Sequence, residues 1–254
     1  MAVAPEYTHR LNFTGYQRIV LDMLSGGEPM RILDVPAGGG QMARALREAG
    51  HEVVAADIND HEEGFVHADM TKRLPFEDQS FDAVVCLEGI EHVLNPHDLI
   101  GELYRVCKVG GRVIVSMPNV QNMFSRVQFL LTGTQHMFHF SQLRDLPPGT
   151  EDDRFHVSPV CLGRLWYEAT YWGARPARVT GDKFKRKALM PVYAVAWALG
   201  WSWTRSLFLK RGRPEHADRN AAMHRAFRSP RVLLGRSLIF EAVKERHVLE
   251  DHPS

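Results

Sequence analysis

The feature that most limits the fold of this chain is an alternation of short apolar segments and longer amphipathic ones that begins at residue 31. Residues 31–35, RILDV, and 52–58, EVVAADI, are apolar enough to be buried strands, and the helical pattern QMARALREAG lies between them. The same order then repeats over a strand, a helix and a strand expected at 81–88, 96–111 and 112–118. Alternating strands and helices predict a parallel sheet with helices on both faces.

The rest of the chain adds to this core. Residues 119–160 break the alternation with scattered histidine, glycine, proline and aromatic residues, and we interpret them as a lid or substrate insertion. Further on, we expect a helix and two strands, the last of them at an edge of the sheet: 158–173, 177–182 and 236–245. One domain, 1–254, is therefore expected, with a helical cap at 1–30, the core at 31–118, the lid at 119–160, an insertion at 183–213 and the final strand at 236–245.

Charge is unevenly distributed along the 254 residues, although the formal total is only +1. Residues 1–182 hold 16 basic and 24 acidic residues, whereas 183–213 holds 8 basic residues and no acidic one. A mildly acidic body excludes a general nucleic-acid binder, which would spread a basic excess over its surface. The three widely spaced cysteines form no disulfide framework or zinc-ribbon pattern, and the N-terminus lacks a signal-peptide pattern, so we expect a cytoplasmic protein.

A glycine-rich loop follows the first strand and points to a nucleotide-like ligand. In PAGGG, Gly38 to Gly40 allow the backbone to approach a ligand at the start of the next helix. Asp57 ends the second strand, 23 residues after Asp34, where a carboxylate can accept both hydroxyls of a ribose. Asp34 at the mouth of the loop would repel a pyrophosphate, so a cationic or neutral ligand is favoured over the NAD of an oxidoreductase.

Four motifs together resemble the class I S-adenosylmethionine-dependent methyltransferases. They are ILDVPAGGG, HADM, FDAVVCLEGIEHV and KVGGRVIVSMPN. The resemblance covers 31–118 well and 154–182 and 236–245 loosely, and it is strongest to the broad group that includes ubiquinone, menaquinone and bacterial glycan methyltransferases. It implies S-adenosyl-L-methionine as cofactor and an α/β, doubly wound, mostly parallel seven-stranded sheet of Rossmann-like methyltransferase fold, with a helical apolar insertion before the last strand.

The resemblance also assigns residues to the cofactor. Asp57 would hold the ribose, and Asp69 the adenine amino group, with the backbone of Met70 beside the ring. The other expected cofactor residues are Asp34, Pro36, Ala37, Gly38, Gly40, Ile58, Leu87 and Glu88. Pro36 departs from the glycine usual in the family, which leaves open a non-catalytic, cofactor-binding partner subunit.

Catalysis of methyl transfer depends mainly on holding the acceptor in line with the methyl group, and a base assists if the acceptor is a hydroxyl. His156 is the preferred base, and Asp152 and Asp153 could orient it; Glu91 and His92 are the other expected catalytic residues. His136 and His139 remain alternative bases. Glu88, Glu91 and His92 have donor atoms suited to a divalent ion, but three residues are a weak pattern and no metal is assigned.

The segment 188–204 contains 17 residues without a charge and is flanked by basic residues on both sides. It is short for a bilayer span, and its tryptophans suit a helix lying in the membrane interface. A helical cap packed on the sheet or a dimer contact is the alternative interpretation, and the oligomeric state stays open.

These features together predict an O-methyltransferase that acts on a lipid-linked or amphipathic acceptor, either a glycan hydroxyl or a quinone precursor. We expect it at the inner face of the membrane, through peripheral contact by 183–213, and with no nucleic-acid partner. A soluble small-molecule methyltransferase of secondary metabolism is the alternative enzyme.

Overall fold

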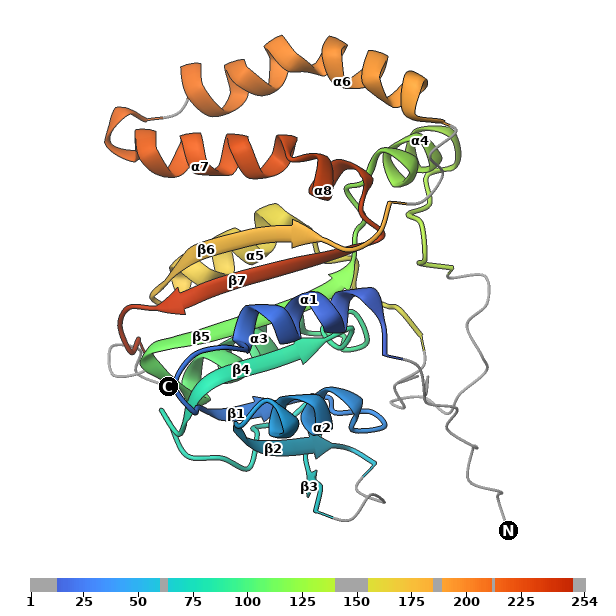
Figure 1. Cartoon of the computed structure of the whole chain (residues 1–254). Helices are drawn as coiled ribbons and strands as arrows, with labels where there is room; N and C mark the ends of the chain where they lie inside the picture. The colour runs from blue at the N-terminus through green and yellow to red at the C-terminus, as the bar shows by residue number, and fades with distance from the viewer. Residues whose placement is uncertain (1–12, 60–63, 140–154, 185–188, 212, 249–254) are drawn as a thin grey trace.

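A computed structural model describes residues 13–59, 64–139, 155–184, 189–211 and 213–248. Seven strands form one sheet with the order β3-β2-β1-β4-β5-β7-β6 (Figure 1). Their bounds are β1 Arg31–Asp34, β2 Glu52–Asp57, β3 Val66–His67, β4 Phe81–Leu87, β5 Cys107–Pro118, β6 Ala174–Gly181 and β7 Ser237–Lys244. The first five strands are parallel, and β7 pairs antiparallel with both β5 and β6. The expected doubly wound, mostly parallel sheet is confirmed.

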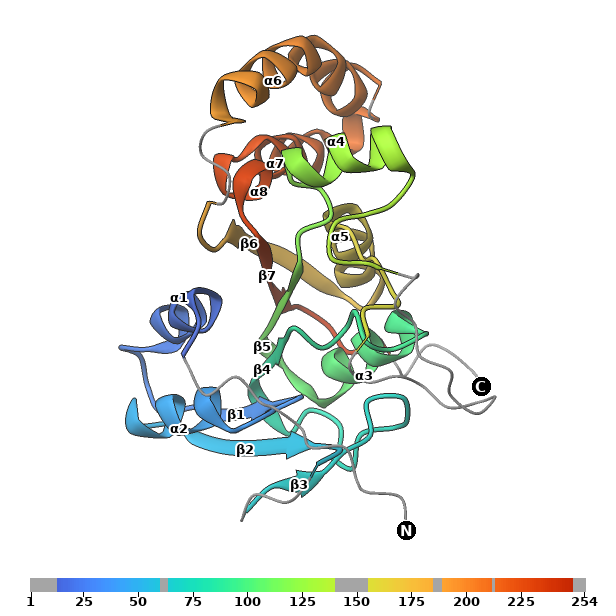
Figure 2. The ribbon, with the colours of Figure 1, turned by 90° about the vertical axis from the view of Figure 1, so that its right-hand side faces the viewer.

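Helices cover both faces of this sheet (Figure 2). Helices α1 (Gly15–Leu24) and α2 (Gln41–Glu48) lie on one face, and α3 (Pro96–Val106) and α5 (Leu162–Tyr171) lie on the other. Neighbouring residues of a strand point to opposite faces, so each strand contributes to two cores. Ile32 packs in the α1–α2 core, for example, whereas Leu33 packs in the α3–α5 core.

Two expectations about β5 and its neighbours were wrong. One is the boundary between α3 and β5, and the other is the position of the last strand in the sheet. The helix expected to reach residue 111 ends at Val106, and β5 begins at once with Cys107, whose backbone is extended. The glycines at 110 and 111 belong to this strand at an irregularity in its pairing with β4. A Cβ at Gly111 would lie 2.8 Å from the carbonyl oxygen of Asp82, so only glycine allows the strands to approach there.

Strand β7 lies between β5 and β6 rather than at the edge of the sheet. Its polar residues suggested an exposed face, but they are buried with partners. Glu241 accepts from Arg112 Nε at 2.6 Å, and Lys244 donates to the carbonyl oxygens of Tyr104 and Cys107, both at 2.7 Å. Buried polar groups that are hydrogen-bonded can occupy a central strand. The alternation of polar and apolar residues in this strand therefore led to a wrong prediction of an edge position.

The additions to the sheet form a helical layer beyond β6. It contains α4 (Met123–Thr132), α6 (Met190–Arg205), a π-helical turn η3 (Ser206–Lys210), a 3-10 turn η4 (Pro214–His216), α7 (Ala217–Arg228) and α8 (Pro230–Leu234). Helix α7 lies between α6 and the sheet, so α6 is not a cap resting on the strands (Figure 1). A small apolar cluster of Met123, Tyr193 and Leu233 joins α4, α6 and α8. None of the helices within the described ranges is long and apolar enough to cross a bilayer.

Candidate active site

The loop between β1 and α2 is shaped by glycines at its two critical positions. Gly38 and Gly40 have φ values of +53° and +72°, a region that other residues rarely adopt. Gly40 is also the N-cap of α2, and a Cβ there would lie 3.0 Å from the Phe65 ring. The loop therefore presents bare backbone at the start of a helix, as anion- and nucleoside-binding loops do.

Asp57 connects the end of β2 to this loop. Its Oδ2 accepts a hydrogen bond from the Gly38 amide at 2.8 Å, and its Oδ1 accepts from the Asn59 amide at 2.9 Å. The carboxylate is buried. The fold thus brings Asp57, the residue expected to hold the ribose, directly beside the glycine loop. Gly38 lies 19 residues earlier in the sequence.

Asp34 lies at the end of β1, buried below the same loop. One of its carboxylate oxygens, Oδ2, accepts no hydrogen bond from the described part of the chain. Burial raises the pKa of Asp34 to about 7, an effect that the Ala43 backbone opposes. A buried carboxyl group with a spare acceptor is stabilised in its charged form by a nearby cation, so the structure keeps the preference for a cationic ligand.

Asp69 and Met70 follow β3, the edge strand that lies beside β2. The carboxylate of Asp69 accepts from the amide and hydroxyl of Thr71, at 2.9 and 2.7 Å, and pairs with Lys72 at 2.8 Å. Asp69 therefore fixes its own turn, and an adenine amino group would be a further partner. Of the remaining expected cofactor residues, Ala37 and Leu87 are buried and Ile58 is exposed.

Pro36 packs against the turn that follows β4. A Cβ at Gly89 would lie only 2.5 Å from Cδ of Pro36, so the proline ring occupies the space beside a glycine. The amide of the next residue, Ala37, still donates to the carbonyl oxygen of Ala56 at 2.9 Å. The departure from the family pattern is thus accommodated by Gly89, and the loop keeps its connection to β2.

The three expected catalytic residues lie together, although His156 is far along the chain. An oxygen of Glu91 and a ring nitrogen of each of His92 and His156 lie within 4.8 Å of one another. The two imidazole rings meet edge to face with centroids 4.8 Å apart. The amides of Val157 and Ser158 both donate to the carbonyl oxygen of Glu91, at 2.9 and 3.0 Å, and hold the two segments in contact.

Backbone contacts determine which ring nitrogen each histidine turns toward the cluster. Nδ1 of His156 lies 3.0 Å from the carbonyl oxygen of Met137, and Nδ1 of His92 lies 3.1 Å from that of Phe155. A carbonyl oxygen only accepts, so Nδ1 carries the proton in each neutral ring and Nε2 the lone pair. Burial, followed by the charge of His92, lowers the pKa of His156 to about 4, so that ring is neutral near pH 7.

Glu91 is the least compensated group of the cluster. Both of its carboxylate oxygens are buried and have no hydrogen-bond partner among the residues described. Burial, together with the charge of Glu88, raises the pKa of Glu91 well above its ordinary value. One carboxylate and two imidazoles that present Nε2 form a donor set that fits a divalent cation, which would offset this burial. Glu88, whose donor atoms were noted in the sequence as suited to an ion, instead accepts from the Ser116 hydroxyl at 3.2 Å.

The other candidate bases lie outside this cluster. The His136 ring meets Phe124 edge to face at 5.0 Å, and its amide donates to the Ser125 hydroxyl. His139 is exposed. Asp152 and Asp153, expected to orient His156, lie outside the described residues.

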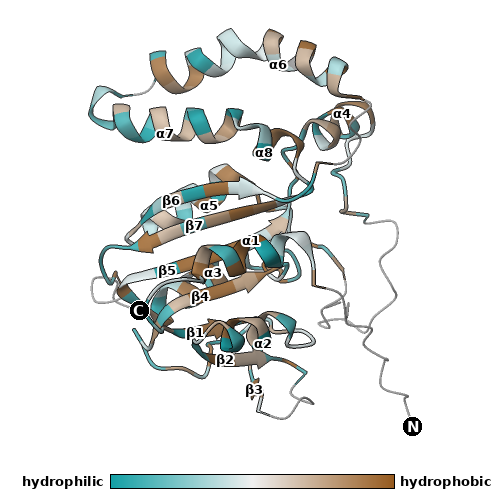
Figure 3. Cartoon of the chain, viewed as in Figure 1, coloured by the Kyte–Doolittle hydropathy of each residue, from teal (hydrophilic) through white to brown (hydrophobic). Residues whose placement is uncertain are grey.

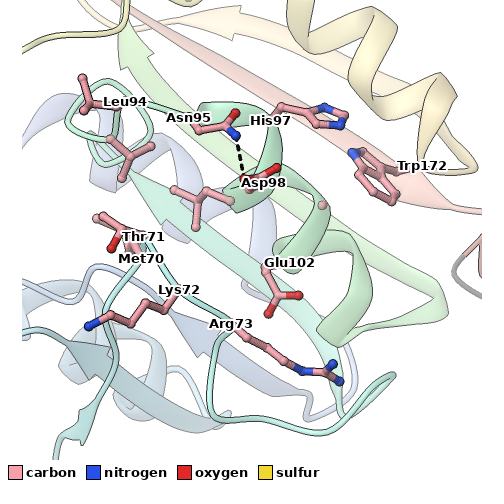
Figure 4. Close-up of a pocket in the computed structure, with 13 residues that line it drawn as sticks. Met70, Thr71, Lys72, Arg73, Leu94, Asn95, His97, Asp98, Glu102 and Trp172 are labelled. Carbon is pink, nitrogen blue, oxygen red and sulfur yellow. Dashed lines mark hydrogen bonds between the residues drawn. The ribbon is translucent and has the colours of Figure 1, made fainter. Parts of the chain in front are cut away.

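A pocket of about 430 Å³ lies apart from the expected cofactor site (Figure 4). It lies between the segment after β3 and helix α3, and Met70 is the one expected cofactor residue that lines it. Its polar groups already have partners: Asn95 donates to Asp98 at 2.6 Å, and Glu102 pairs with the buried Arg105, which lies outside the lining, at 2.7 Å. A pocket whose charges are already paired gives no indication of a ligand.

Sequence reasoning missed Arg236, which directly precedes β7. Its positive charge lowers the pKa of both Glu88 and Glu91, against the larger effect of their burial. No local pattern could have identified it, because only the antiparallel return of the chain along β5 brings it to the site.

Comparisons with known proteins agree with this geometry. Residues 33–115 match the model of a methyltransferase domain family. A demethylmenaquinone methyltransferase of Clavibacter sepedonicus is 43% identical over 98 residues, which are 34% of this chain and 40% of that protein. A ubiquinone biosynthesis O-methyltransferase of Pseudomonas aeruginosa is 30% identical over 166 residues, 59% of this chain and 67% of that one.

The fold is also similar to that of solved methyltransferases. A solved S-adenosylmethionine-dependent methyltransferase from Archaeoglobus fulgidus superposes with a TM-score of 0.53 and 17% identity, over 90% of this chain and 94% of that chain. The matched stretches span about two fifths to two thirds of the curated relatives' own lengths, so their substrates do not carry over. The chain belongs to the class I S-adenosylmethionine-dependent methyltransferases, with S-adenosylmethionine as its cofactor.

Proposed function

We propose that this protein transfers the methyl group of S-adenosylmethionine to a hydroxyl oxygen of an amphipathic or lipid-linked acceptor at a membrane surface. The observation that carries the proposal is the cluster of Glu91, His92 and His156 at the carboxyl end of β4. Ligands of open α/β sheets bind at that end, so the cluster lies beside the glycine loop and can face an acceptor. Two groups of curated relatives, one named for demethylmenaquinone methylation and one an O-methyltransferase of ubiquinone biosynthesis, support the choice of acceptor class.

In this mechanism His156 receives the proton of the acceptor hydroxyl. The acceptor oxygen forms a bond to the methyl carbon while the bond to sulfur breaks, which leaves the neutral thioether S-adenosylhomocysteine. The hydroxyl proton passes to Nε2 of His156, the nitrogen that carries the lone pair because Nδ1 donates to Met137. The His92 ring packs edge to face against the His156 ring. A general base such as His156 accelerates a reaction by about 10²- to 10⁴-fold.

If the enzyme uses a divalent cation, Glu91, His92 and His156 would instead be its ligands, and Nε2 of His156, bound to the cation, would no longer be the base. A bound cation would supply a lowered pKa of the acceptor hydroxyl and a counter-charge for Glu91. The backbone carbonyl groups that bond Nδ1 of each histidine are the usual outer partners of imidazole ligands.

Replacing the proposed base tests its role. The variant His156→Gln should turn over about 10²- to 10⁴-fold more slowly than wild type, while S-adenosylhomocysteine binds within twofold of wild type. Turnover is measured as S-adenosylhomocysteine released with a long-chain alkyl catechol as acceptor. His216→Gln, in the distant η4 turn, is the matched control. Wild-type turnover in His156→Gln would contradict the assignment.

Titration with Co²⁺ tests the metal donor set without an activity assay. The protein should bind one equivalent with the visible absorption of a low-symmetry site, and Glu91→Gln should weaken this binding at least tenfold, because the carboxylate is the set's only anion. His216→Gln should bind like wild type. Absence of saturable binding, or equal binding by Glu91→Gln, would show that the three groups act without a metal.

The membrane part of the proposal rests on the outer side of α6. Val192, Val195, Leu199 and Trp203 recur at helical spacing and are 60%, 61%, 77% and 71% exposed. On the opposite side, Trp197 and Trp201 cover the guanidinium of Arg228, which lies 4.6 and 3.1 Å from their ring centroids. Only one of the three tryptophans expected at the membrane is therefore directed outward, and the other two hold α6 on α7.

Helix α4 extends this apolar surface. Its Phe129, Leu130 and Leu131 are exposed, Leu130 at 82%, and hydrophobic residues recur along both helices in Figure 3. Exposed apolar residues gathered on neighbouring helices mark an interaction site. The 183–213 segment adds eight basic residues and no acidic one, and each can contribute about 1 kcal/mol near an anionic leaflet. An anionic bilayer therefore fits this surface better than a second, equally basic copy.

Flotation with vesicles tests the surface. The protein should float with phosphatidylglycerol-containing vesicles and much less with pure phosphatidylcholine. The double variant Val195→Glu/Leu199→Glu should lose about tenfold or more in binding, because two apolar side chains no longer enter the interface. The control Leu94→Glu/Tyr167→Glu changes two equally exposed apolar residues elsewhere and should float like wild type. Equal flotation of both double variants would favour a soluble acceptor.

A further inference from the structure

Arg236 occupies the acceptor side of the active site. It directly precedes β7, whose first residue, Ser237, pairs with Pro118 at the carboxyl end of β5. The Asn119 amide donates to the carbonyl oxygen of Arg236 at 2.9 Å, and the Arg236 amide donates to the carbonyl oxygen of Lys183 at 3.3 Å. The backbone therefore holds this residue firmly at the end of the sheet where ligands bind.

The guanidinium of Arg236 is half-buried and lacks a partner. Among the residues described, no oxygen accepts a hydrogen bond from it, and no carboxylate lies within ion-pair distance. Two of the nearby acids are held by other donors: Glu88 accepts from the Ser116 hydroxyl, and Asp182 accepts from the Ser237 amide at 2.9 Å. The third, Glu91, has no hydrogen-bond partner among the described residues, and the charge of Arg236 lowers its pKa without a direct ion pair. A partly desolvated guanidinium whose five donors are unused is suited to an anionic ligand.

A small cavity adjoins this cation. Beyond Arg236, its lining combines aromatic rings, leucines, an amide and a glycine: Phe124, His136, Tyr193, Leu233, Leu234, Asn122 and Gly235. These residues come from α4, α6 and α8 and the segments beside them. Its volume is about 20 Å³, which is room for about one water molecule, so the cavity could take part of an anionic group beside the guanidinium but not an aromatic body.

The carboxylate of S-adenosylmethionine is the other anion that could reach a cation in this site. The glycine loop follows β1, however, and Arg236 precedes β7, three strands away in the order β1-β4-β5-β7. Neighbouring strands lie about 4.8 Å apart, which separates the two positions by about 14 Å across the sheet. Arg236 therefore lies on the acceptor side rather than beside the cofactor's amino-acid part.

We propose that Arg236 is a specificity-determining residue that binds an anionic group, a carboxylate or a phosphate, carried by the methyl acceptor. This inference rests on the proposed methyl transfer and narrows its substrate class to acidic amphipathic acceptors. The anion would bind the guanidinium, the apolar body would lie outside the small cavity, and the hydroxyl would point toward His156.

Calorimetric titration of probes into the complex with S-adenosylhomocysteine tests the assignment. The probes are 3,4-dihydroxybenzoate, its neutral methyl ester, and phenyl phosphate. Arg236→Gln should weaken binding of the acid at least tenfold and of the ester less than twofold, and Arg236→Lys should fall between. Arg231→Gln, an exposed arginine on α8, should bind every probe like wild type. Whichever of the carboxylate and the phosphate depends more on Arg236 identifies the anion.

Three results would overturn the assignment. They are absence of saturable binding of both anionic probes to wild type, an equal loss for acid and ester in Arg236→Gln, and a loss of S-adenosylhomocysteine affinity in that variant. The last would place the guanidinium at the cofactor. Failure of wild type to bind S-adenosylhomocysteine at all would be a different outcome, because it would refute the proposed methyl transfer itself.

Discussion

The site depends on the burial of carboxyl groups at the carboxyl ends of neighbouring strands. Asp34, Asp57 and Glu91 are almost fully buried at the ends of β1, β2 and shortly after β4. An uncompensated buried charge is costly, and the chain compensates these groups unequally. Asp57 accepts two backbone amides, whereas Asp34 and Glu91 keep unbonded oxygens and raised pKa values. A protein arranged in this way is stabilised by cationic ligands, and S-adenosylmethionine carries both a sulfonium and an ammonium group.

The two halves of the molecule contribute different parts of the chemistry. The parallel strands and their helices build the cofactor half, in which Gly38 and Asp57 join the glycine loop to β2. The half to which we assign the acceptor is assembled from additions: the segment with His156, helix α4, and the helices that precede β7. The small cluster of Met123, Tyr193 and Leu233 ties these additions together without using the main core. Acceptor specificity can therefore change while the sheet remains the same.

Much of the cofactor half was predictable from sequence because its signals are local. The alternation of strands and helices predicted the sheet, and the glycine loop and Asp57 were expected to serve one ligand. The structure brings the Asp57 carboxylate to 2.8 Å from the Gly38 amide. The acceptor half depends on distant contacts. Nothing near His156 in sequence shows that its neighbours donate to the Glu91 carbonyl group, and nothing near Arg236 shows that its charge acts on Glu88. Buried partners such as Arg112 and Glu241 likewise concealed the central position of β7.

The central claim is that the glycine loop and Asp57 bind S-adenosylmethionine. Calorimetric titration of S-adenosylhomocysteine, and separately of NAD, into wild type and Asp57→Ala tests it most directly, with Glu52→Ala on the exposed start of β2 as control. The account predicts that wild type and Glu52→Ala bind S-adenosylhomocysteine and not NAD, and that Asp57→Ala binds at least about tenfold more weakly, because hydrogen bonds to a charged group are lost. Binding of NAD, or equal binding of S-adenosylhomocysteine by wild type and Asp57→Ala, would contradict it.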